Sequence, residues 1–451
     1  MKHKFSQVKR FTLTLICAFF GALVYGQQGT SFTLQDAVVY GVAHQVNIQK
    51  SKLELDKNEQ RFNEALALYL PQVRASGGVN NNLKLATNII PGAVFGQPGQ
   101  DVAVKFGTKY TVNGFIDASQ VIYDQSLITG LSANKELQTI TQLSVNKSEE
   151  QVIFDVAIAY YNVQLIGLQK EIVLANVKKL DSLLKITKVQ LDLGFAKQLD
   201  YDKLKVNRTN LETELSNIEL NYQQQLVYLK YVMAYPLDET IQLSTNIEQE
   251  KVASSIATKM DVTTNLDFQI LIAQRRMNTI NINQLKAGYL PSLSLGFRYG
   301  YQAQRNQLDF LSSATTWYPN SVLSINMNVP IFDGFTKHAK IQQLSIQQKQ
   351  SLLDEEQLKN TLNFQLKNME TKLNVSLGAM ETQRNNLQLA EAIYQTTMLQ
   401  YQSGIISTAE LLNAETSLKE AQTNYLRSVA QIRMAELEAL KAAGNIKSII
   451  K

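Results

Sequence analysis

The stretch SLSLGFRYGY at residues 292–301 decides the fold class. Its odd-numbered residues are apolar or aromatic, and its even-numbered residues are small or polar. The same alternation holds in LSINMNV at residues 323–329. A period of two predicts strands with one apolar face and one polar face. Soluble sheets also show this pattern, so alternation alone does not place the strands in a membrane.

Aromatic residues at the ends of these strands favour a membrane. Tyr299 and Tyr301 end the apolar side of the first stretch, and Trp317 and Tyr318 come just before the second. Tyrosine and tryptophan at strand ends form the interfacial girdle of outer-membrane barrels. Stretches 73–79 and 112–118 alternate more faintly. The sequence therefore predicts four membrane strands whose apolar face contacts outer membrane lipids.

Four strands cannot close a barrel, and a sheet in a membrane cannot leave an edge unpaired. The barrel must then be shared between symmetry-related chains. Two chains would give eight strands and a filled interior, whereas three would give twelve strands and an open lumen. The periodicity leaves both possibilities open.

Sequence landmarks recur along the chain. Tyr69-Leu70-Pro71 recurs at 289–291, and Ile122-Tyr123-Asp124 corresponds to the Ile-Phe-Asp of 331–333. Gly194 corresponds to Gly404, and each second copy lies about 210–220 residues after the first. This recurrence predicts two copies of one unit: a helix, two strands, a long helix, a turn and a long helix. We place the copies at residues 27–240 and 262–443, with a connecting segment at 241–261 and a C-terminal tail at 444–451.

The helices predicted in each copy are too long for a globular core. The first helix covers about 33–69 in one copy and 262–288 in the other, because Pro71 and Pro291 end them. Residues 126–192 and 335–402 contain no proline, and a helix of that length is about 100 Å long. A heptad seam then predicts antiparallel coiled-coil packing. Its members are Leu387, Ala390, Tyr394, Thr397, Tyr401, Leu411, Ala414, Leu418, Ala421, Tyr425 and Ile432.

Residues 1–26 have the organisation of a secretory signal peptide, with a basic start, an apolar run at 11–20 and a cleavage point after Gly26. The apolar run is shorter than the ~20 residues that span a membrane. After Gly26 no uninterrupted apolar stretch of ~18 residues follows, so we expect no transmembrane helix. The long stretch 86–108 is expected to be an extracellular loop.

The composition excludes several classes of function. Without the leader the chain is almost neutral, which disfavours nucleic-acid binding. Cys17 is the single cysteine and lies in the leader, while His44 and His338 fall at predicted helix starts. A disulfide framework, a Cys/His zinc site and a Cys/His catalytic pair are thus excluded. We expect no catalytic residue, metal or cofactor, and we assign Asp124 to helix capping.

With these features the chain resembles the TolC-like outer membrane factors of bacterial efflux pumps and type I secretion systems. The resemblance covers the mature chain and rests on the duplication and on the two helix–turn–helix tips. In these tips Gly404 is followed six residues later by Glu410, and Gly194 by Asp200. The resemblance implies a homotrimer in which a twelve-stranded outer-membrane barrel continues as a coiled-coil α-helical barrel across the periplasm. A periplasmic adaptor protein and an inner-membrane transporter of the RND or ABC type would open the tip.

The resemblance also implies that acidic residues narrow the pore at the tip. By position these are Asp200 and Glu410, while Asn413 stands where a second acid is common. Ile406 replaces the family's basic residue, so Lys197 and Lys203 are the nearest candidates to offset the charge.

The function expected from these features is that of a passive channel without chemistry of its own. The alternative is an exported coiled-coil scaffold or adhesin without a channel, which would explain the heptads but not the girdled strands. A secreted enzyme has no residue constellation in its favour. Extraction separates the first two, because only a barrel requires detergent.

Overall fold

The computed structural model describes residues 31–96, 98–244 and 262–450. The expected signal peptide and most of the connecting segment therefore lie outside the described residues. The chain divides into two compact units. The first contains the described residues up to Ser51, from Val145 to Leu266 and from Lys359 onward, and the second contains Lys52–Ser144 and Asp267–Leu358. Each unit takes segments from both halves of the sequence.

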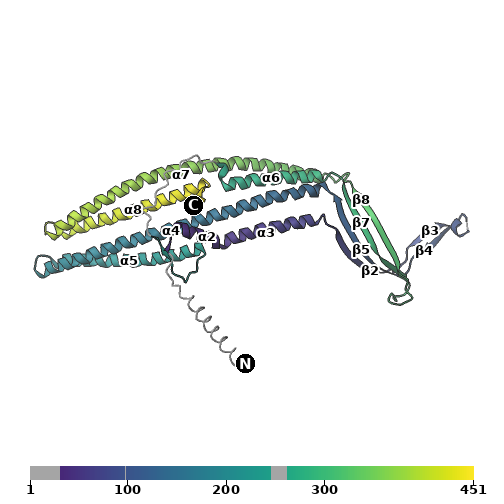
Figure 1. Ribbon diagram of the computed structural model, residues 1–451, viewed down its shortest axis with the longest axis horizontal. Helices are drawn as coiled ribbons and strands as arrows, with labels where there is room; N and C mark the ends of the chain where they lie inside the picture. The colour runs from purple at the N-terminus through teal and green to yellow at the C-terminus, as the bar shows by residue number, and fades with distance from the viewer. Residues whose placement is uncertain (1–30, 97, 245–261, 451) are drawn as a thin grey trace, which may run out of the picture. The chain divides into compact units, whose positions relative to one another are not determined.

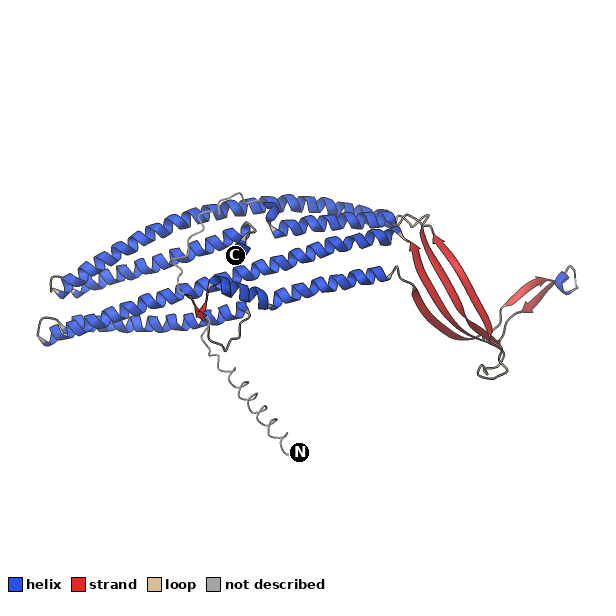
Figure 2. Ribbon diagram, viewed as in Figure 1, coloured by secondary structure: helices blue, strands red, loops and turns tan. Residues whose placement is uncertain are grey.

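The second unit contains a four-stranded antiparallel sheet (Figures 1 and 2). Its strands are β2 (Gln72–Asn81), β5 (Tyr110–Tyr123), β7 (Ser292–Arg305) and β8 (Tyr318–Asn328), in the order β2-β5-β7-β8. The four predicted strands are therefore present. Trp317 directly precedes β8, and Tyr318 is its first residue. Each half of the sequence supplies one pair of neighbouring strands, and the pairing of β5 with β7 joins the halves.

The register aligns the faces of all four strands. Val73, Ala118, Phe297 and Leu323 form one cross-strand row. The adjacent row consists of Arg74, Asp117, Arg298 and Val322. Because residues opposite each other share a face, the sheet has one apolar and one polar face, as predicted. Tyr299 and Tyr301 lie on the apolar face with their hydroxyl oxygens 3.0 Å apart.

Helices α3 (Val46–Ala67) and α6 (Leu266–Ala287) lead into β2 and β7 through equivalent turns. The amide of Tyr69 donates to the carbonyl of Leu66 at 2.9 Å, and that of Tyr289 donates to the carbonyl of Lys286 at 3.1 Å. Pro71 and Pro291 follow at the start of the extended chain. Proline cannot continue a helix, which explains why both helices end here.

The prediction of one helix over 33–69 is wrong. The segment contains α2 (Leu34–His44) and α3, which are separated at Gln45 in extended conformation. The side-chain amide of Gln45 donates to the carbonyl of Val232 at 3.1 Å, a contact that stabilises the break. His44 therefore ends α2 instead of beginning a helix, whereas His338 does lie in the first turn of α7 (Thr336–Gln402).

Two long helical hairpins repeat one design. α4 (Gln125–Asp192) has 68 residues and α5 (Gln198–Met233) has 36. α7 has 67 residues and α8 (Thr408–Ala442) has 35. Asp124 caps α4 as predicted, because its Oδ1 accepts from the amide of Leu127 at 3.1 Å. Every member of the predicted heptad seam is buried or half-buried, in agreement with coiled-coil packing.

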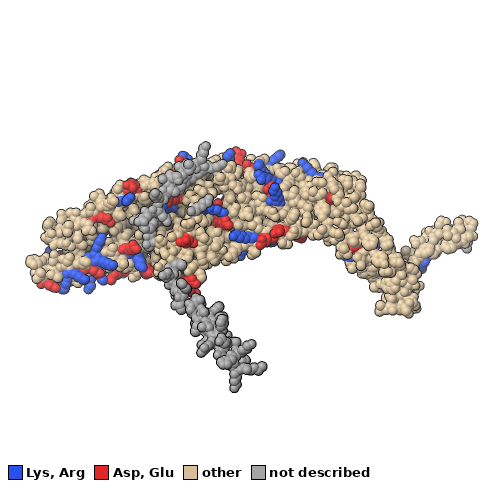
Figure 3. Space-filling model, in the orientation of Figure 1, with Lys and Arg blue, Asp and Glu red and all other residues tan. Residues whose placement is uncertain are grey.

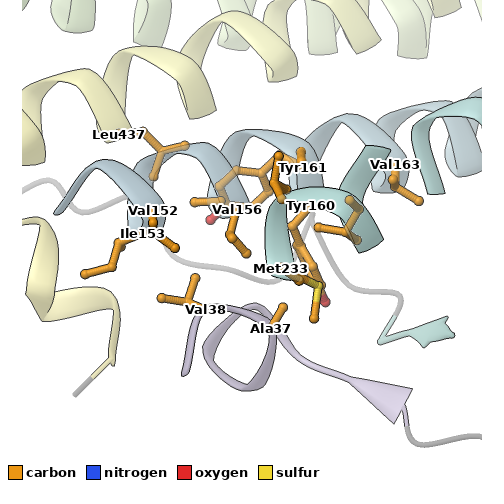
Figure 4. Close-up of a cluster of buried hydrophobic side chains, with 14 of the residues drawn as sticks. Ala37, Val38, Val152, Ile153, Val156, Tyr160, Tyr161, Val163, Met233 and Leu437 are labelled. Atoms are coloured by element: carbon orange, nitrogen blue, oxygen red, sulfur yellow. The ribbon is translucent and has the colours of Figure 1, made fainter. Parts of the chain in front are cut away.

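The core of the first unit is built around the middle of α4 (Figure 4). Val156 and Tyr160 pack there with Val38 of α2, Met233 of α5 and Leu437 of α8. In the part of the chain that the structure describes, α4 contains a stretch long and apolar enough to cross a membrane by length and composition alone. Half of that stretch is buried inside the protein, so packing accounts for its apolar character.

Short elements that the sequence did not predict complete both units. In the first unit, β1 (Ser31–Phe32) pairs in parallel with β6 (Gln242–Leu243). The expected C-terminal tail forms a 3₁₀ helix (Ile446–Ile450) whose Ile446 is fully buried. In the second unit, the expected loop 86–108 contains a further hairpin of β3 (Thr87–Pro91) and β4 (Asp101–Lys105).

Candidate functional site

Both tips turn through the same hydrogen-bond pattern. Gly194 and Gly404 have φ angles of +80° and +71°. The residue after each glycine donates its amide five residues back, Phe195 to Gln190 at 2.7 Å and Ile405 to Gln400 at 2.9 Å. This is a Schellman motif, whose left-handed position favours glycine because a side chain is strained there. The sequence marked both turns correctly.

The predicted constriction residues lie directly after these turns. Asp200 is half-buried in the first turn of α5, and Glu410 is exposed in the first turn of α8. The hydroxyl of Ser407 accepts from the amide of Glu410 at 3.3 Å and caps α8. Asn413 is exposed one turn further along. Acids in the first turn of a helix are favoured by the helix dipole, so this placement suits stabilisation of α5 and α8 as well as a pore ring.

The structure does not bring the candidate lysines to these acids. Lys197 is the N-cap residue of α5, and Lys203 lies exposed on the same helix. Within the described chain, neither lysine forms an ion pair with Asp200 or Glu410. Ile406, in the place of the family's basic residue, is half-buried against the core between the hairpins.

The two hairpins share one core in the first unit. Leu180 and Leu183 of α4 and Leu204 of α5 are buried with Leu411 and Leu418 of α8. Buried polar pairs cross this core at two levels. The hydroxyl oxygens of Thr187 and Tyr401 are 3.3 Å apart, and the Asn176 side chain donates to that of Gln422 at 3.1 Å. Satisfied polar pairs of this kind fix the register between packed helices.

A groove of about 480 Å³ lies between α5 and α8, just behind the tip. Its lining includes Glu415, whose Oε2 accepts from the Asn207 side chain at 2.7 Å. Burial raises the pKa of Glu415, while the Asn207 hydrogen bond and the nearby Lys419 ammonium oppose that rise. Lys419 itself pairs with Glu214 of α5. Glu415 is therefore a carboxylate held in the contact between the two hairpins at an electrostatic cost.

Tyr394 of α7 faces the same carboxylate. Burial, with a smaller contribution from the charge of Glu415, raises the pKa of Tyr394 to about 12. The Lys179 ammonium lies 5.7 Å from the centre of its ring. Tyr394 thus stays protonated at neutral pH, and Glu415 is the group of this pair that titrates.

Glu415→Gln should strengthen the contact between α5 and α8 at neutral and alkaline pH. Because the pKa of Glu415 is raised on folding, its protonated form stabilises the folded state relative to the ionised form. This stabilisation is fully present below the unfolded pKa and is lost as the pH rises through the folded pKa. Glutamine keeps an oxygen for Asn207 and removes the charge. Hydrogen exchange of α5 and α8 at pH 4 and pH 8 should show that the protection of the wild type falls with pH and that the protection of the variant stays constant. Glu420→Gln, on an exposed face of α8, is the control and should behave as wild type. A pH response that persists in the Glu415→Gln variant would contradict this assignment.

Sequence reasoning missed several residues of the tip. Phe195 and Ile405 are 83% and 71% exposed directly after the turn glycines. An apolar residue following the glycine in both copies was the available signal. The pairing of Asn207 with Glu415 had no such signal, because it joins different halves of the chain. Among the described residues, His, Cys, Asp and Glu form no group of three that could hold a metal ion.

Known proteins share this architecture. Residues 262–445 match the family described as outer membrane efflux protein. The chain is 19% identical to the outer membrane efflux protein BepC of Brucella suis, over 94% of this chain and 88% of BepC. It is 20% identical to the outer membrane protein TolC of Vibrio cholerae, over 71% of this chain and 75% of TolC. The solved structure of CusC matches with a TM-score of 0.73 at 17% identity, covering 93% of this chain and 95% of CusC.

These comparisons agree with the fold described above. The structural likeness establishes the fold, which combines strands with long helical hairpins. The two relatives named are outer membrane proteins. Residues 262–445 thus match the outer membrane efflux protein family, and the chain shares the fold of CusC.

Proposed function

We propose that the chain is the outer membrane channel component of a tripartite efflux or type I secretion system. In this role it is a passive homotrimeric conduit from the periplasm to the exterior, opened at its tip by an adaptor and a pump. The observation that carries the proposal is the four-stranded sheet with two faces and two free edges.

The direction of the edge strands supports closure by identical copies. β2 and β8 are the edges, and all neighbours within the sheet are antiparallel, so β2 and β8 run in opposite directions. The β8 edge of one chain can then pair antiparallel with the β2 edge of the next. Repetition of that contact closes a ring and leaves no edge in the lipid. A scaffold or adhesin would leave both the edges and the apolar face of the sheet in water.

The polar face supports twelve strands in preference to eight. It carries small residues such as Ser294, Gly296 and Ser324 together with Arg74 and Arg298. Small and charged side chains do not fill a closed interior, whereas an eight-stranded barrel is just wide enough for side chains to fill it. A trimer with a wet lumen accommodates them.

The tip supports the adaptor and pump as partners. Phe195 and Ile405 place exposed apolar side chains at the ends of both hairpins. An exposed apolar residue at the same position of both tips is compatible with a surface that a partner covers. We assign this surface to the periplasmic adaptor, which would act with an inner-membrane transporter of the RND or ABC type. The two halves of the chain, 27–240 and 262–443, would then offer similar tips to that partner.

The assembly state tests the proposal. Light scattering of the detergent-purified protein, with the detergent contribution subtracted, should give three times the mass of the mature chain. The complex should need detergent for extraction and dissociate on heating. A stable monomer, or recovery in the soluble periplasmic fraction, would overturn the shared barrel.

The tip carboxylates give a second test. In a trimer, three copies each of Asp200 and Glu410 would surround the narrow end, and each unscreened pair at ~6 Å would repel by roughly 3 kcal/mol at an effective dielectric of about 20. Multivalent cations entering from the tip should therefore block the channel in planar bilayers. Glu410→Gln combined with Asp200→Asn should weaken that block. Equal block in both proteins would limit the role of these acids to their interaction with the helix dipoles.

A further inference from the structure

The polar face of the sheet carries its charges at one level. Arg74 of β2, Asp117 of β5 and Arg298 of β7 occupy the same cross-strand row. They are the charged residues of this face in the four described strands. The space-filling view also shows charge gathered over the helices and little over the strands (Figure 3). A row with three charges on an otherwise neutral face calls for an explanation.

The contacts in this row leave one arginine in excess. Arg298 Nε donates to Asp117 Oδ1 at 2.6 Å, and the Ser76 hydroxyl donates to Asp117 Oδ2 at 3.3 Å. The Arg298 guanidinium also lies 5.2 Å from the ring centre of Phe115. Asp117 thus uses both oxygens, and Arg74 forms no hydrogen bond or ion pair with the described residues. The row carries a net charge of one positive unit per chain.

The surroundings leave room for a ligand. A hollow of about 570 Å³ lies on this face, lined by Arg74, Ser76, Asp117, Ser119, Arg298 and Ser324 among others. Hydroxyl groups beside guanidinium groups are suitable donors for an oxyanion, and arginine binds carboxylate and phosphate oxygens through two parallel hydrogen bonds. Neutral side chains such as Gln72 and Asn80 already make this face polar, so hydration does not require the extra charge.

We propose that Arg74 and Arg298 form an anion-binding ring inside the barrel, which takes carboxylate, phosphate or sulfate groups of transported molecules. The proposal rests on the proposed function, because only closure of the barrel turns this row into a ring. Arg74 is the third residue of β2, which follows α3 by a short turn, so the ring lies near the helix end of the sheet. Cargo leaving the helical part would meet it first in the barrel.

Block by inorganic tripolyphosphate in planar bilayers tests the ring with the full-length trimer. Tripolyphosphate should reduce the wild-type current, most strongly at low salt, where the Debye length is longest. Arg74→Gln should weaken the apparent affinity by roughly tenfold, because a charge-assisted hydrogen bond contributes at least that factor. Arg74→Lys should fall between the two, since it keeps the charge without the planar fork. Lys84→Gln removes one positive charge in the segment after β2 and should match wild type.

A variant of opposite sign keeps the test independent of losses in folding. Asp117→Asn removes the negative charge of the row and should strengthen the block. Unchanged block in Arg74→Gln, or weaker block in Asp117→Asn, would overturn the anion-binding ring. The proposed function would still stand in that case, provided that the wild-type protein conducts current. A wild-type preparation without channel currents would overturn the proposed function and the ring with it.

Discussion

Gly300→Ala is expected to abolish the assembled channel. A Cβ atom at Gly300 would lie 2.0 Å from the carbonyl oxygen of Gly114 and 2.6 Å from Cδ1 of Phe115. The oxygen belongs to the backbone of the neighbouring strand β5 and cannot move away without separating β5 from β7. Ordinary overpacking costs about 1–3 kcal/mol, and a clash with backbone exceeds that range. The cost recurs in every chain of the oligomer.

Gly114→Ala is the matched control, because a Cβ atom there meets nothing within 4 Å. Both variants change glycine to alanine in the same pair of strands. Gel migration with and without heating, together with the yield of detergent-extracted oligomer, measures assembly. The oligomer should be lost in Gly300→Ala and recovered at a near-normal yield in Gly114→Ala. Comparable yields of oligomer from the two variants would show that β5 and β7 pair differently.

Leu323→Arg should reduce assembly, whereas Ser324→Arg should not. Leu323 lies in the middle of β8 on the apolar face and is 71% exposed in the single chain, so little packing is lost on substitution. An arginine facing lipid at mid-depth in a barrel costs about 2–4 kcal/mol. Ser324 lies at the same depth on the polar face, where an added guanidinium stays hydrated.

The yield of each arginine variant in the outer membrane fraction, relative to wild type, measures this difference. The two substitutions introduce the same side chain one residue apart, so expression and export affect them equally. Similar losses in both variants would mean that the two faces of the sheet do not differ in environment.

Local signals in the sequence predicted the elements that local chemistry controls. The alternation at 292–301 and 323–329, the prolines at 71 and 291 and the glycines at 194 and 404 each restrict the backbone on their own. The strands, helix ends and turns follow from them. The heptad seam was predictable for the same reason, because its period shows which side of each helix is buried.

The parts that were missed depend on contacts between distant segments. The break at Gln45 contains no proline or glycine and is stabilised by a carbonyl of α5. The β1–β6 pair and the docking of Ile446 likewise join segments far apart in sequence. At the tip, spacing placed Asp200 and Glu410 directly after the turns, where the first turns of α5 and α8 contain them. It could not show that Lys197 and Lys203 stay apart from them, or that Glu415 is buried against Asn207.

The strand order also has a consequence for the order of folding steps. Residues 82–109, which include the β3–β4 hairpin, join β2 to β5, and residues 306–317 join β7 to β8, so each pair closes a comparatively short loop. The β5–β7 pairing joins residues as distant as Tyr110 and Arg305. Loop closure over such a separation is entropically costly, and non-local strand pairing is slow. We therefore expect the β2–β5 and β7–β8 pairs to form first and the β5–β7 pairing to follow as a late step. We expect the rate of this pairing, and not the rate of helix formation, to limit how fast each chain completes its sheet.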